Sequence, residues 1–421
     1  MKRNANDYDV AVIGGGLTGL TAAVYLARAG QSVLVLEKER ELGGLARTAN
    51  LNGALFNLGP HAMYEGGAAL CILGELGCLP TGGHAAKGSL IGVLQGQILE
   101  VPSGLTPEEN EEWNSVMAGL RDIDTEPIRS TGVQAWAEQH IRLERVRLFF
   151  YAMCRQWSYC DDISRLSAGY AIRQGQLAGQ GVRYVEGGWQ TVVDQLRQAA
   201  LQAGAAIASG SGAEEILIAD GRVEGLKLSD GAFIRVSSVI AAAGIREACR
   251  LVKDFEQMSL GRWLSASSPL YAACLDVALR RVPRPERVFA LGLDEPFYFS
   301  KHSGPVSLSD NGAQVMHAMR YNNGDGARDA VCDKLALTRL MDLLQPGWER
   351  EVVAIRYSPN ILVAHDARTA IHNGAGPAPD HTVPEVAGLY VAGDWVGPEG
   401  RLADAGMASA KRAAQAAIAR L

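Results

Sequence analysis

The sequence lacks the features that mark nucleic-acid-binding, disulfide-rich or membrane-spanning proteins. Its 421 residues hold 40 Lys and Arg against 46 Asp and Glu, and no dense basic run, so we expect no nucleic-acid partner. The seven cysteines form an odd set without a C-x-x-C pair, which predicts neither a disulfide framework nor a zinc site and favours a reducing, cytoplasmic location. No apolar stretch reaches the roughly 18 to 20 residues of a membrane span, so we predict no integral membrane segment.

Hydrolase and metal motifs are also missing. No G-x-S-x-G elbow occurs. His365 and His372 lie seven residues apart with Asp366 between them, but neither the spacing nor the context forms a ligand set. We therefore interpret both histidines as loop or surface residues and predict no metal site.

Glycine, by contrast, is abundant, with 48 residues in a chain of otherwise ordinary globular composition. The apolar run from Tyr8 to Gly16 is short and ends in glycines, which indicates a buried strand rather than a signal peptide. Residues Leu17 to Arg28 predict a helix closed by Gly30, and Gln31 to Glu37 predict a second buried strand. The chain therefore opens with a strand, a helix and a strand.

Further elements follow along the chain. Residues 133–176 have helical spacing with many aromatics, and the stretch after Gly187 and Gly188 predicts an amphipathic helix ending at Gly204. Three short strands follow, around EEILIA, VEGLKLS and AFIRVSSVIAAAG, separated by Asp-Gly turns. Near the end we predict a strand at Gly388 to Val396 and a terminal helix at Ala403 to Leu421.

The first turn carries a dinucleotide-binding pattern. Gly14, Gly16 and Gly19 form G-x-G-x-x-G between the first strand and helix, and Glu37 ends the next strand. The first glycine allows the tight turn, the second lets the backbone approach a pyrophosphate, and the third permits close helix packing. The helix N-terminus attracts the phosphates, and Glu37 suits a ribose hydroxyl pair and disfavours a 2′-phosphate. The alternative is a glycine-rich turn with a solvated glutamate.

The next residues, KERELGGLAR, resemble the flavin amine oxidase and phytoene desaturase superfamily of FAD-dependent oxidoreductases. Members of that superfamily continue from the ribose-binding acid to a GG-x-x-R turn that contacts the phosphates and ribityl chain of FAD. The resemblance implies FAD contacts from Lys38, Gly43, Gly44 and Arg47. Without that context, the turn would be a loop with one surface arginine.

The resemblance continues at FNLGPHAMY, the segment that enters the flavin site in phytoene dehydrogenase-like proteins. It implies that Gly59 and Pro60 turn the chain beside the isoalloxazine and that His61 faces the ring or the substrate. Histidine can exchange a proton near neutral pH, so His61 is a candidate catalytic residue. The alternative is a structural histidine beneath the flavin.

The C-terminal stretch GLYVAGDWVGPEGRLADAGMASAKRAA resembles the closing motif of the superfamily. It implies that Gly393 and Asp394 bind the ribityl or phosphate region, and that Gly406, Met407 and Ala408 approach the pyrimidine edge. A helix N-terminus there would stabilise the negative charge of reduced flavin. Trp395 is a candidate wall of the substrate site, with packing as the alternative.

The predicted fold is α/β, with a Rossmann-type, GR2-like FAD-binding domain assembled from discontinuous segments and an α+β substrate domain. We expect the FAD-binding domain to comprise residues 1–60, 181–255 and 385–421, and the substrate domain residues 61–180 and 256–384. The resemblance is strong at both ends and loose through the substrate region.

The predicted function is an FAD-dependent dehydrogenase, desaturase or oxidase. It would pass a hydride from a C-H bond of a small, largely apolar or amine-bearing substrate to flavin N5, with an unidentified electron acceptor. We favour C-C over C-N oxidation, and noncovalent FAD because no cysteine lies near the terminal motif. Two alternatives stay open: a non-redox flavin-dependent isomerase or cyclase, and a flavin-free binding protein like the GDP dissociation inhibitors. The oligomeric state is not predicted.

Overall fold

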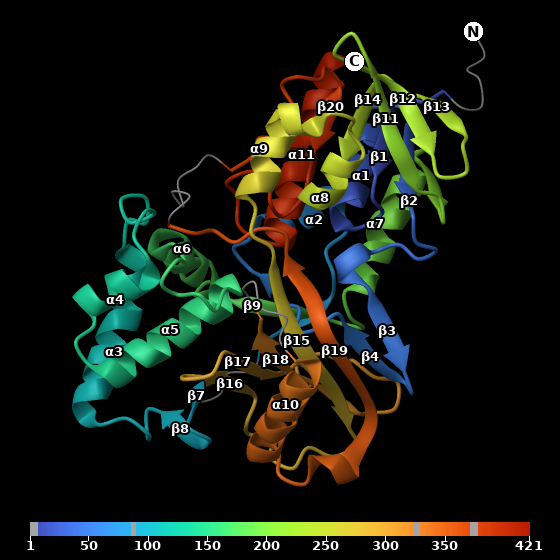
Figure 1. Cartoon of the computed structure of the whole chain (residues 1–421). Coiled ribbons are helices and arrows are strands. Elements are labelled where there is room, and N and C mark those ends of the chain that lie inside the picture. The colour runs from blue at the N-terminus through green and yellow to red at the C-terminus, as the bar shows by residue number, and fades with distance from the viewer. Residues whose placement is uncertain (1–6, 86–89, 323–328, 371–377) are drawn as a thin grey trace.

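The computed structural model describes residues 7–85, 90–322, 329–370 and 378–421. A five-stranded parallel sheet forms the centre of one half of the molecule (Figure 1). Its order is β10(Ala206–Ser209), β2(Val33–Glu37), β1(Val10–Ile13), β14(Ser238–Ala241) and β20(Leu389–Val391). The strands come from three separated stretches of chain, and the predicted α/β class with a parallel sheet is confirmed.

Both faces of this sheet are covered, which explains why β1, and β2 up to its terminal Glu37, are apolar. Val10 and Val12 of β1 enter a core shared with α1(Leu17–Arg28), α2(Ala68–Leu76), α7(Gln190–Gln202) and α11(Ala403–Arg420). Ala11 and Ile13 enter the opposite core, as the alternation of side chains along a strand requires. That second core also contains residues of the small sheet β11(Ala213–Ala219), β12(Arg222–Leu228) and β13(Phe233–Arg235), and of α8(Ile245–Arg250) and α9(Ser259–Ala266).

The helix predicted at Leu17 to Arg28 is confirmed with those bounds. Two predicted strands were wrong in extent. The segment AFIRVSSVIAAAG forms two strands, β13 and β14, which belong to different sheets. The strand predicted at Gly388 to Val396 covers only Leu389–Val391, because the chain turns at Gly393, whose carbonyl accepts a hydrogen bond from the Val396 amide at 3.1 Å.

The other half is built on a seven-stranded mixed sheet. Its order is β19(Val352–Ala364), β15(Leu270–Leu279), β18(Gln314–Tyr321), β17(Phe297–Lys301), β16(Phe289–Gly292), β7(Leu90–Leu94) and β8(Gln97–Val101). The helix α10(Ala330–Leu344) packs on one face. A helical group, α3(Pro107–Gly119), α4(Val133–His140), α5(Glu144–Ser158) and α6(Ala168–Ala178), lies beside the sheet in Figure 1.

A short hairpin and a small three-stranded sheet lie between the halves. The strands β3(Thr48–Leu51) and β4(Ala54–Asn57) pair with each other, and β9(Val182–Val185) lies between β5(Met63–Tyr64) and β6(Gly82–His84). The domain limits stay a proposal. The proposed limits assign α2 and α9 to the substrate domain. In the structure, however, both helices pack in the cores on the two faces of the parallel sheet.

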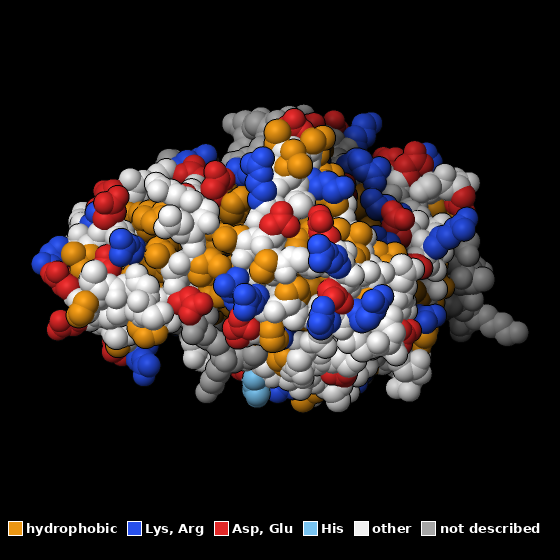
Figure 2. Space-filling view, turned by 90° about the horizontal axis from the view of Figure 1, so that it is seen from below, with side chains coloured by type: hydrophobic (Ala, Val, Ile, Leu, Met, Phe, Trp, Pro, Cys, Tyr) orange, Lys and Arg blue, Asp and Glu red, His pale blue; other side chains and the backbone are white. Residues whose placement is uncertain are grey.

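The face seen from below in Figure 2 carries acidic and basic side chains side by side, with apolar side chains between them. It therefore shows no extended field of one sign. Among the described residues, no helix combines the length and apolar character that crossing a membrane requires.

Candidate active site

Two of the three glycines in the first turn are required by the protein's own packing. Gly14 has φ +112°, and a Cβ there would lie 2.4 Å from the carbonyl oxygen of Ala242. A Cβ at Gly19 would lie 1.9 Å from the carbonyl oxygen of Gly14. These glycines bring α1 close to its preceding strand, as the predicted pattern requires.

Gly16 differs, because a Cβ there would make only ordinary contacts with the protein. Its φ is −82°, and an added Cβ would meet the carbonyl oxygen of Gly43 at an ordinary 3.6 Å. The two glycine turns lie against each other, with the Gly43 amide donating to the Gly15 carbonyl at 2.9 Å and Gly44 beside Gly16. The first turn of α1 has no side-chain cap and no acidic residue. This uncapped helix N-terminus therefore suits an anionic ligand.

Glu37 is buried at the rim of these turns. One carboxylate oxygen accepts from the Gly15 amide at 2.8 Å and the other from the Glu39 amide at 2.9 Å. Since each oxygen has two lone pairs, both retain the capacity to accept a ribose hydroxyl. Lys38 is exposed, and the Arg47 side chain packs against Gly43. We keep these residues as proposed FAD contacts.

The Gly59 to His61 segment bridges the glycine turns and the seven-stranded sheet. The two ring nitrogens of His61 lie 3.1 Å from the carbonyl oxygens of Gly59 and Leu45, and Leu45 belongs to the second glycine turn. A Cβ at Gly59 would lie 3.0 Å from Ile361 of β19 and 3.6 Å from Cys274 of β15. Burial lowers the pKa of His61, which favours the neutral imidazole. A neutral imidazole has a single N-H, so it can donate to only one of the two carbonyl oxygens.

Hydrogen bonds from Ser409 of α11 join the two parts of the closing motif. The Ser409 hydroxyl lies 3.0 Å from the amide nitrogen of Gly393 and from the carbonyl oxygens of Gly393 and Gly406. A Cβ at Gly406 would lie 2.6 Å from Thr18 of α1, so the two helices approach closely here. Met407 and Ala408 are buried in the same core as α1.

His365 lies in a loop, as predicted, directly after β19, but its side chain has a partly buried partner that the prediction did not include. Its imidazole donates to Asp394 at 2.7 Å, and its backbone amide donates to the other carboxylate oxygen at 3.1 Å. Although burial opposes both charges, this pairing holds the pKa of Asp394 below and that of His365 above their usual values. Sequence spacing gave no indication of this pair, because the two residues are 29 positions apart and meet only in the folded chain. His372 lies outside the described residues.

Asp404, in the first turn of α11, is a candidate site residue that sequence reasoning missed. It is 6% exposed, and its carboxylate accepts from the Ala69 amide at the start of α2 at 2.8 Å. Gly67 leaves no space between them, since a Cβ there would lie 2.4 Å from the carboxylate. Burial raises the pKa of Asp404 to about 6. A carboxyl group that titrates near neutral pH beside a cofactor motif is a candidate functional group.

Asp404→Asn is expected to stabilise the protein at pH 8 and to change it little at pH 4. The raised pKa means that the folded chain holds the proton more tightly, so wild-type stability falls as pH rises from about 4 through 6. The full cost is roughly 3 kcal/mol, and asparagine still accepts from Ala69. Urea unfolding of both proteins across this range is the measurement, and equal pH dependence in both would contradict the assignment.

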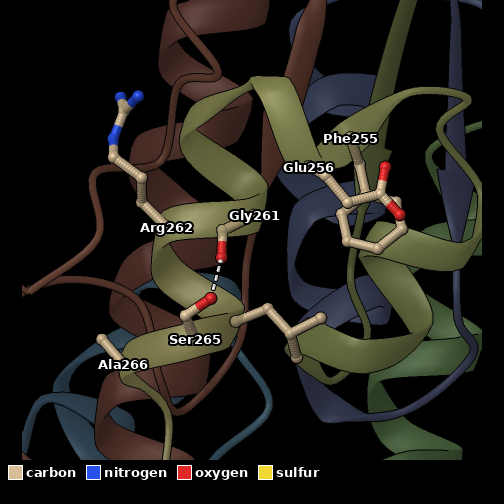
Figure 3. A pocket seen from close by; sticks show the side chains of 7 residues that line it. Phe255, Glu256, Gly261, Arg262, Ser265 and Ala266 are labelled. Carbon is tan, nitrogen blue, oxygen red and sulfur yellow. Dashed lines mark hydrogen bonds between the residues drawn. The ribbon is translucent and has the colours of Figure 1, made fainter.

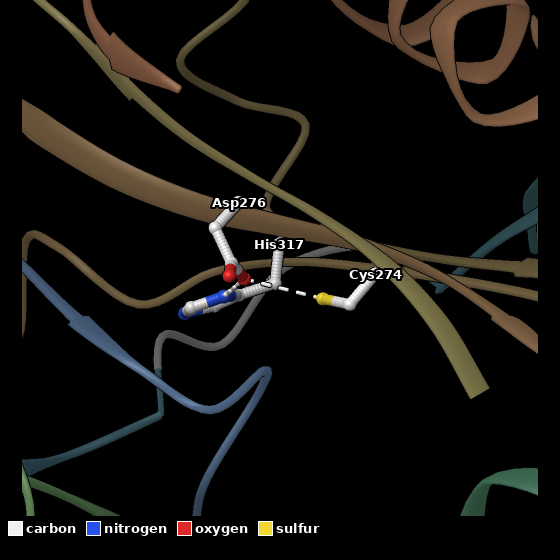
Figure 4. A group of neighbouring side chains, drawn as sticks. All are labelled: Cys274, Asp276 and His317. Atoms are coloured by element: carbon white, nitrogen blue, oxygen red, sulfur yellow. Dashed lines mark hydrogen bonds and ion pairs between the residues drawn. The ribbon is translucent and has the colours of Figure 1, made fainter. Parts of the chain in front are cut away.

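A buried ionic cluster joins the seven-stranded sheet to the segment before Gly59. Asp276 of β15 is fully buried and accepts from His317 at 2.6 Å, from Arg356 at 2.6 and 2.9 Å, and from the Cys274 thiol at 3.1 Å. Arg356 also donates to the carbonyl oxygens of Phe56 and Asn57. Figure 4 shows Cys274, Asp276 and His317 converging.

These three side chains have the donor types and proximity of a metal site. However, the Asp276 oxygens already accept hydrogen bonds from His317 and Arg356. Burial also raises the pKa of the Cys274 thiol well above its usual value. A protonated thiol and a carboxylate that already serves a guanidinium are poor metal ligands, so we interpret the cluster as a structural anchor.

Trp395 and a surface hollow are two further features of the half built on the parallel sheet. Trp395 is buried, and its indole N-H donates to the Ala243 carbonyl at 2.9 Å, so we leave it out of the proposed substrate site. A surface hollow lies between Phe255 and Ala266, along α9 (Figure 3). The Ser265 hydroxyl there donates to the Gly261 carbonyl at 2.9 Å, and Arg262 points away from the hollow. Neither feature adds a group to the site.

Parts of the chain are similar in sequence to known desaturases. The chain is 52% identical over 52 residues to carotenoid 3,4-desaturase of Haloarcula japonica, which is 12% of this chain and 10% of that protein. It is 24% identical over 277 residues to hydroxyneurosporene desaturase of Rubrivivax gelatinosus, 55% of this chain and 52% of that protein. Both alignments thus span less than two thirds of the relatives' lengths.

Solved structures share the fold over nearly the whole chain. An oxidoreductase from Methanosarcina mazei has a TM-score of 0.80 at 18% identity, covering 96% of this chain and all of that one. Cyclohexylamine oxidase from Brevibacterium oxydans has a TM-score of 0.73 at 17% identity, covering 98% and 99%.

The side-chain-free backbone at Gly16 and Gly44, the uncapped N-terminus of α1 and the Glu37 carboxylate held by two backbone amides fit the diphosphate and ribose of FAD. The family model of the FAD dependent oxidoreductases matches residues 9–260, more than half of the chain. The chain therefore belongs to the FAD dependent oxidoreductase family, and its cofactor is FAD.

Proposed function

We propose that this oxidoreductase removes a hydride from a C-H bond of a small, largely apolar or amine-bearing substrate. The observation that carries the proposal is the position of the Gly59 to His61 segment. It contacts Leu45 of the second glycine turn on one side, and β15 and β19 of the seven-stranded sheet on the other. A substrate bound against that sheet would therefore lie next to the cofactor.

The apolar and aromatic character of this region supports an organic substrate. Tyr298 and Tyr321 of the sheet pack in one core with Phe150 and Trp157 of the helical group. Such surroundings exclude water and orient a substrate through apolar contacts, leaving few polar groups to set its direction. FAD, when bound, supplies the hydride acceptor.

The residues that would hold FAD are those of the two glycine turns and the closing motif. The amides at the start of α1 and the backbone around Gly16 and Gly44 would bind the diphosphate, and Glu37 the ribose. Asp394, oriented by His365, would accept from the ribityl chain. We keep noncovalent binding as part of the proposal.

C-C oxidation is the favoured reaction. The desaturase relatives support it, although their alignments cover only part of each protein. The fold shared with cyclohexylamine oxidase leaves C-N oxidation as the second option. The two reactions differ in their products, an alkene or an imine, and an imine hydrolyses in water.

The test is anaerobic titration of the FAD-loaded protein with a panel of alkenes, saturated acids, alcohols and amines. Bleaching of the flavin by a donor, with a product two mass units lighter, is the expected result. A carbonyl product together with released amine would indicate C-N oxidation. If no donor bleaches the flavin and the reduced protein instead isomerises a substrate without net oxidation, the hydride proposal fails.

His61→Ala is expected to retain FAD and to lower turnover by less than about tenfold, because both ring nitrogens already face backbone carbonyls. Loss of a general base costs about 10² to 10⁴ in rate. The measurement is FAD content and the pH profile of turnover with the donor identified above. A hundredfold loss with an altered pH profile would return His61 to a catalytic role.

A further inference from the structure

Arg401, just before α11, is a buried cation with unused hydrogen-bond donors. It is 5% exposed, and its Nε and one terminal nitrogen have no hydrogen-bond partner in the described part of the chain. Leaving buried charged donors unsatisfied is costly. A guanidinium with free donors is also the side chain best shaped for binding a carboxylate.

The carboxylates around Arg401 are already paired with other cations. Asp394 accepts from His365 at 2.7 Å, and Asp366 pairs with Arg368 at 3.5 Å. Together the two carboxylates balance the charges of Arg368 and Arg401. Within the described ranges, however, the Nε and one terminal nitrogen of Arg401 donate to neither carboxylate, so an anion could bind there without displacing the contacts of Asp394 and Asp366.

The position of Arg401 indicates the substrate side of the site. Its guanidinium lies over the ring of Tyr170, 5.6 Å from the centroid, and Tyr170 belongs to α6 of the helical group rather than to the parallel sheet. Tyr159 and Cys160, at the end of α5, also interact electrostatically with Arg401.

A neutral hydroxyl group lies beside the cation. The Tyr170 hydroxyl is buried, interacts with Arg401 and has no other hydrogen-bond partner within the described ranges. Burial raises the pKa of this phenol, so it carries a proton at neutral pH. A hydroxyl that accepts from a guanidinium still has its own proton to donate to an anion.

We propose that Arg401 and the Tyr170 hydroxyl bind a carboxylate group of the substrate. The substrate would then be an organic acid, with its carboxylate at Arg401 and its apolar part among the side chains of the helical group and the seven-stranded sheet. This inference rests on the proposed function and narrows its substrate class.

The test uses benzoate as an anionic probe and benzamide as its neutral counterpart of similar shape. Each is titrated into the FAD-loaded protein, and binding is followed by the flavin difference spectrum and by calorimetry. The variants are Arg401→Gln, Arg401→Lys and Tyr170→Phe. Arg262→Gln is the charge-matched control, since the Arg262 side chain is 69% exposed on α9.

Wild type and Arg262→Gln are expected to bind benzoate at least about tenfold more tightly than benzamide, because charge-assisted hydrogen bonds are the stronger kind. Arg401→Gln should lower the affinity for benzoate by at least about tenfold, while the affinity for benzamide and the FAD content stay unchanged. Tyr170→Phe should lower the affinity for benzoate by a smaller factor. Arg401→Lys should retain part of the preference for benzoate over benzamide. If Arg401→Gln does not fold, Arg401→Lys is compared with wild type instead.

Three results would overturn the inference. The first is equal affinity of wild type for the two probes, or no benzoate binding up to about 50 mM, which is weaker than a specific ion contact should give. The second is unchanged benzoate affinity in Arg401→Gln. The third is loss of FAD from that variant, which would assign the guanidinium to the cofactor. None of these readouts needs turnover, so failure of the hydride proposal is detected separately, by the absence of any donor that bleaches the flavin.

Discussion

Gly16→Val is expected to give a folded protein that does not retain FAD. Valine adopts the extended backbone of residue 16 (φ −82°, ψ −175°) without strain, and an added Cβ meets only an ordinary contact at 3.6 Å. The branched side chain would instead occupy the space in front of the α1 N-terminus, where the diphosphate must approach. We expect bound FAD to fall below about a tenth of the wild-type amount.

The measurement is the ratio of visible to ultraviolet absorbance after gel filtration, with far-ultraviolet circular dichroism as the test of folding. Gly119→Val is the matched control, because Gly119 has φ −70° and no atom within 4 Å of an added Cβ. It lies at the end of α3, in the helical group. A Gly16→Val protein that purifies fully yellow would show that the diphosphate lies elsewhere.

Asp276→Asn is expected to lower the free energy of unfolding by about 3 to 5 kcal/mol, the range observed when one partner of a buried ion pair is removed. The substitution leaves the Arg356 guanidinium without its counter-charge and turns an amide toward the donors of His317 and Arg356.

Urea unfolding at pH 7 measures this effect. Glu351→Gln is the control, since its partner Arg281 is 81% exposed and such pairs contribute less than about 1 kcal/mol. A double variant, Asp276→Leu with Arg356→Leu, should recover part of the loss because both charges are removed together. Similar losses in Asp276→Asn and Glu351→Gln would contradict the anchor interpretation.

The cofactor half could be predicted because its determinants are local. The buried run Val10–Ile13, the glycines that follow it and the helix Leu17–Arg28 lie within twenty residues, and each of these elements appears in the structure. Gly14 and Gly19 have the packing roles that the pattern implies.

The remaining site residues depend on contacts between distant segments. His317 and Arg356 lie 41 and 80 residues from Asp276 and meet it only because β18 and β19 flank β15. The partner of Asp394 and the raised pKa of Asp404 likewise arise from tertiary burial. For the same reason the sequence could not show that Trp395 packs inward or that Arg401 has unused donors.

The visible absorption spectrum of the purified protein, followed by heat release and mass analysis of any chromophore, tests the central claim most directly. We predict bands near ~370 and ~450 nm and free FAD in the supernatant, as expected of a noncovalent flavoenzyme. A colourless protein that cannot be reconstituted with FAD would contradict the binding site assigned to the two glycine turns, and with it the proposed hydride transfer.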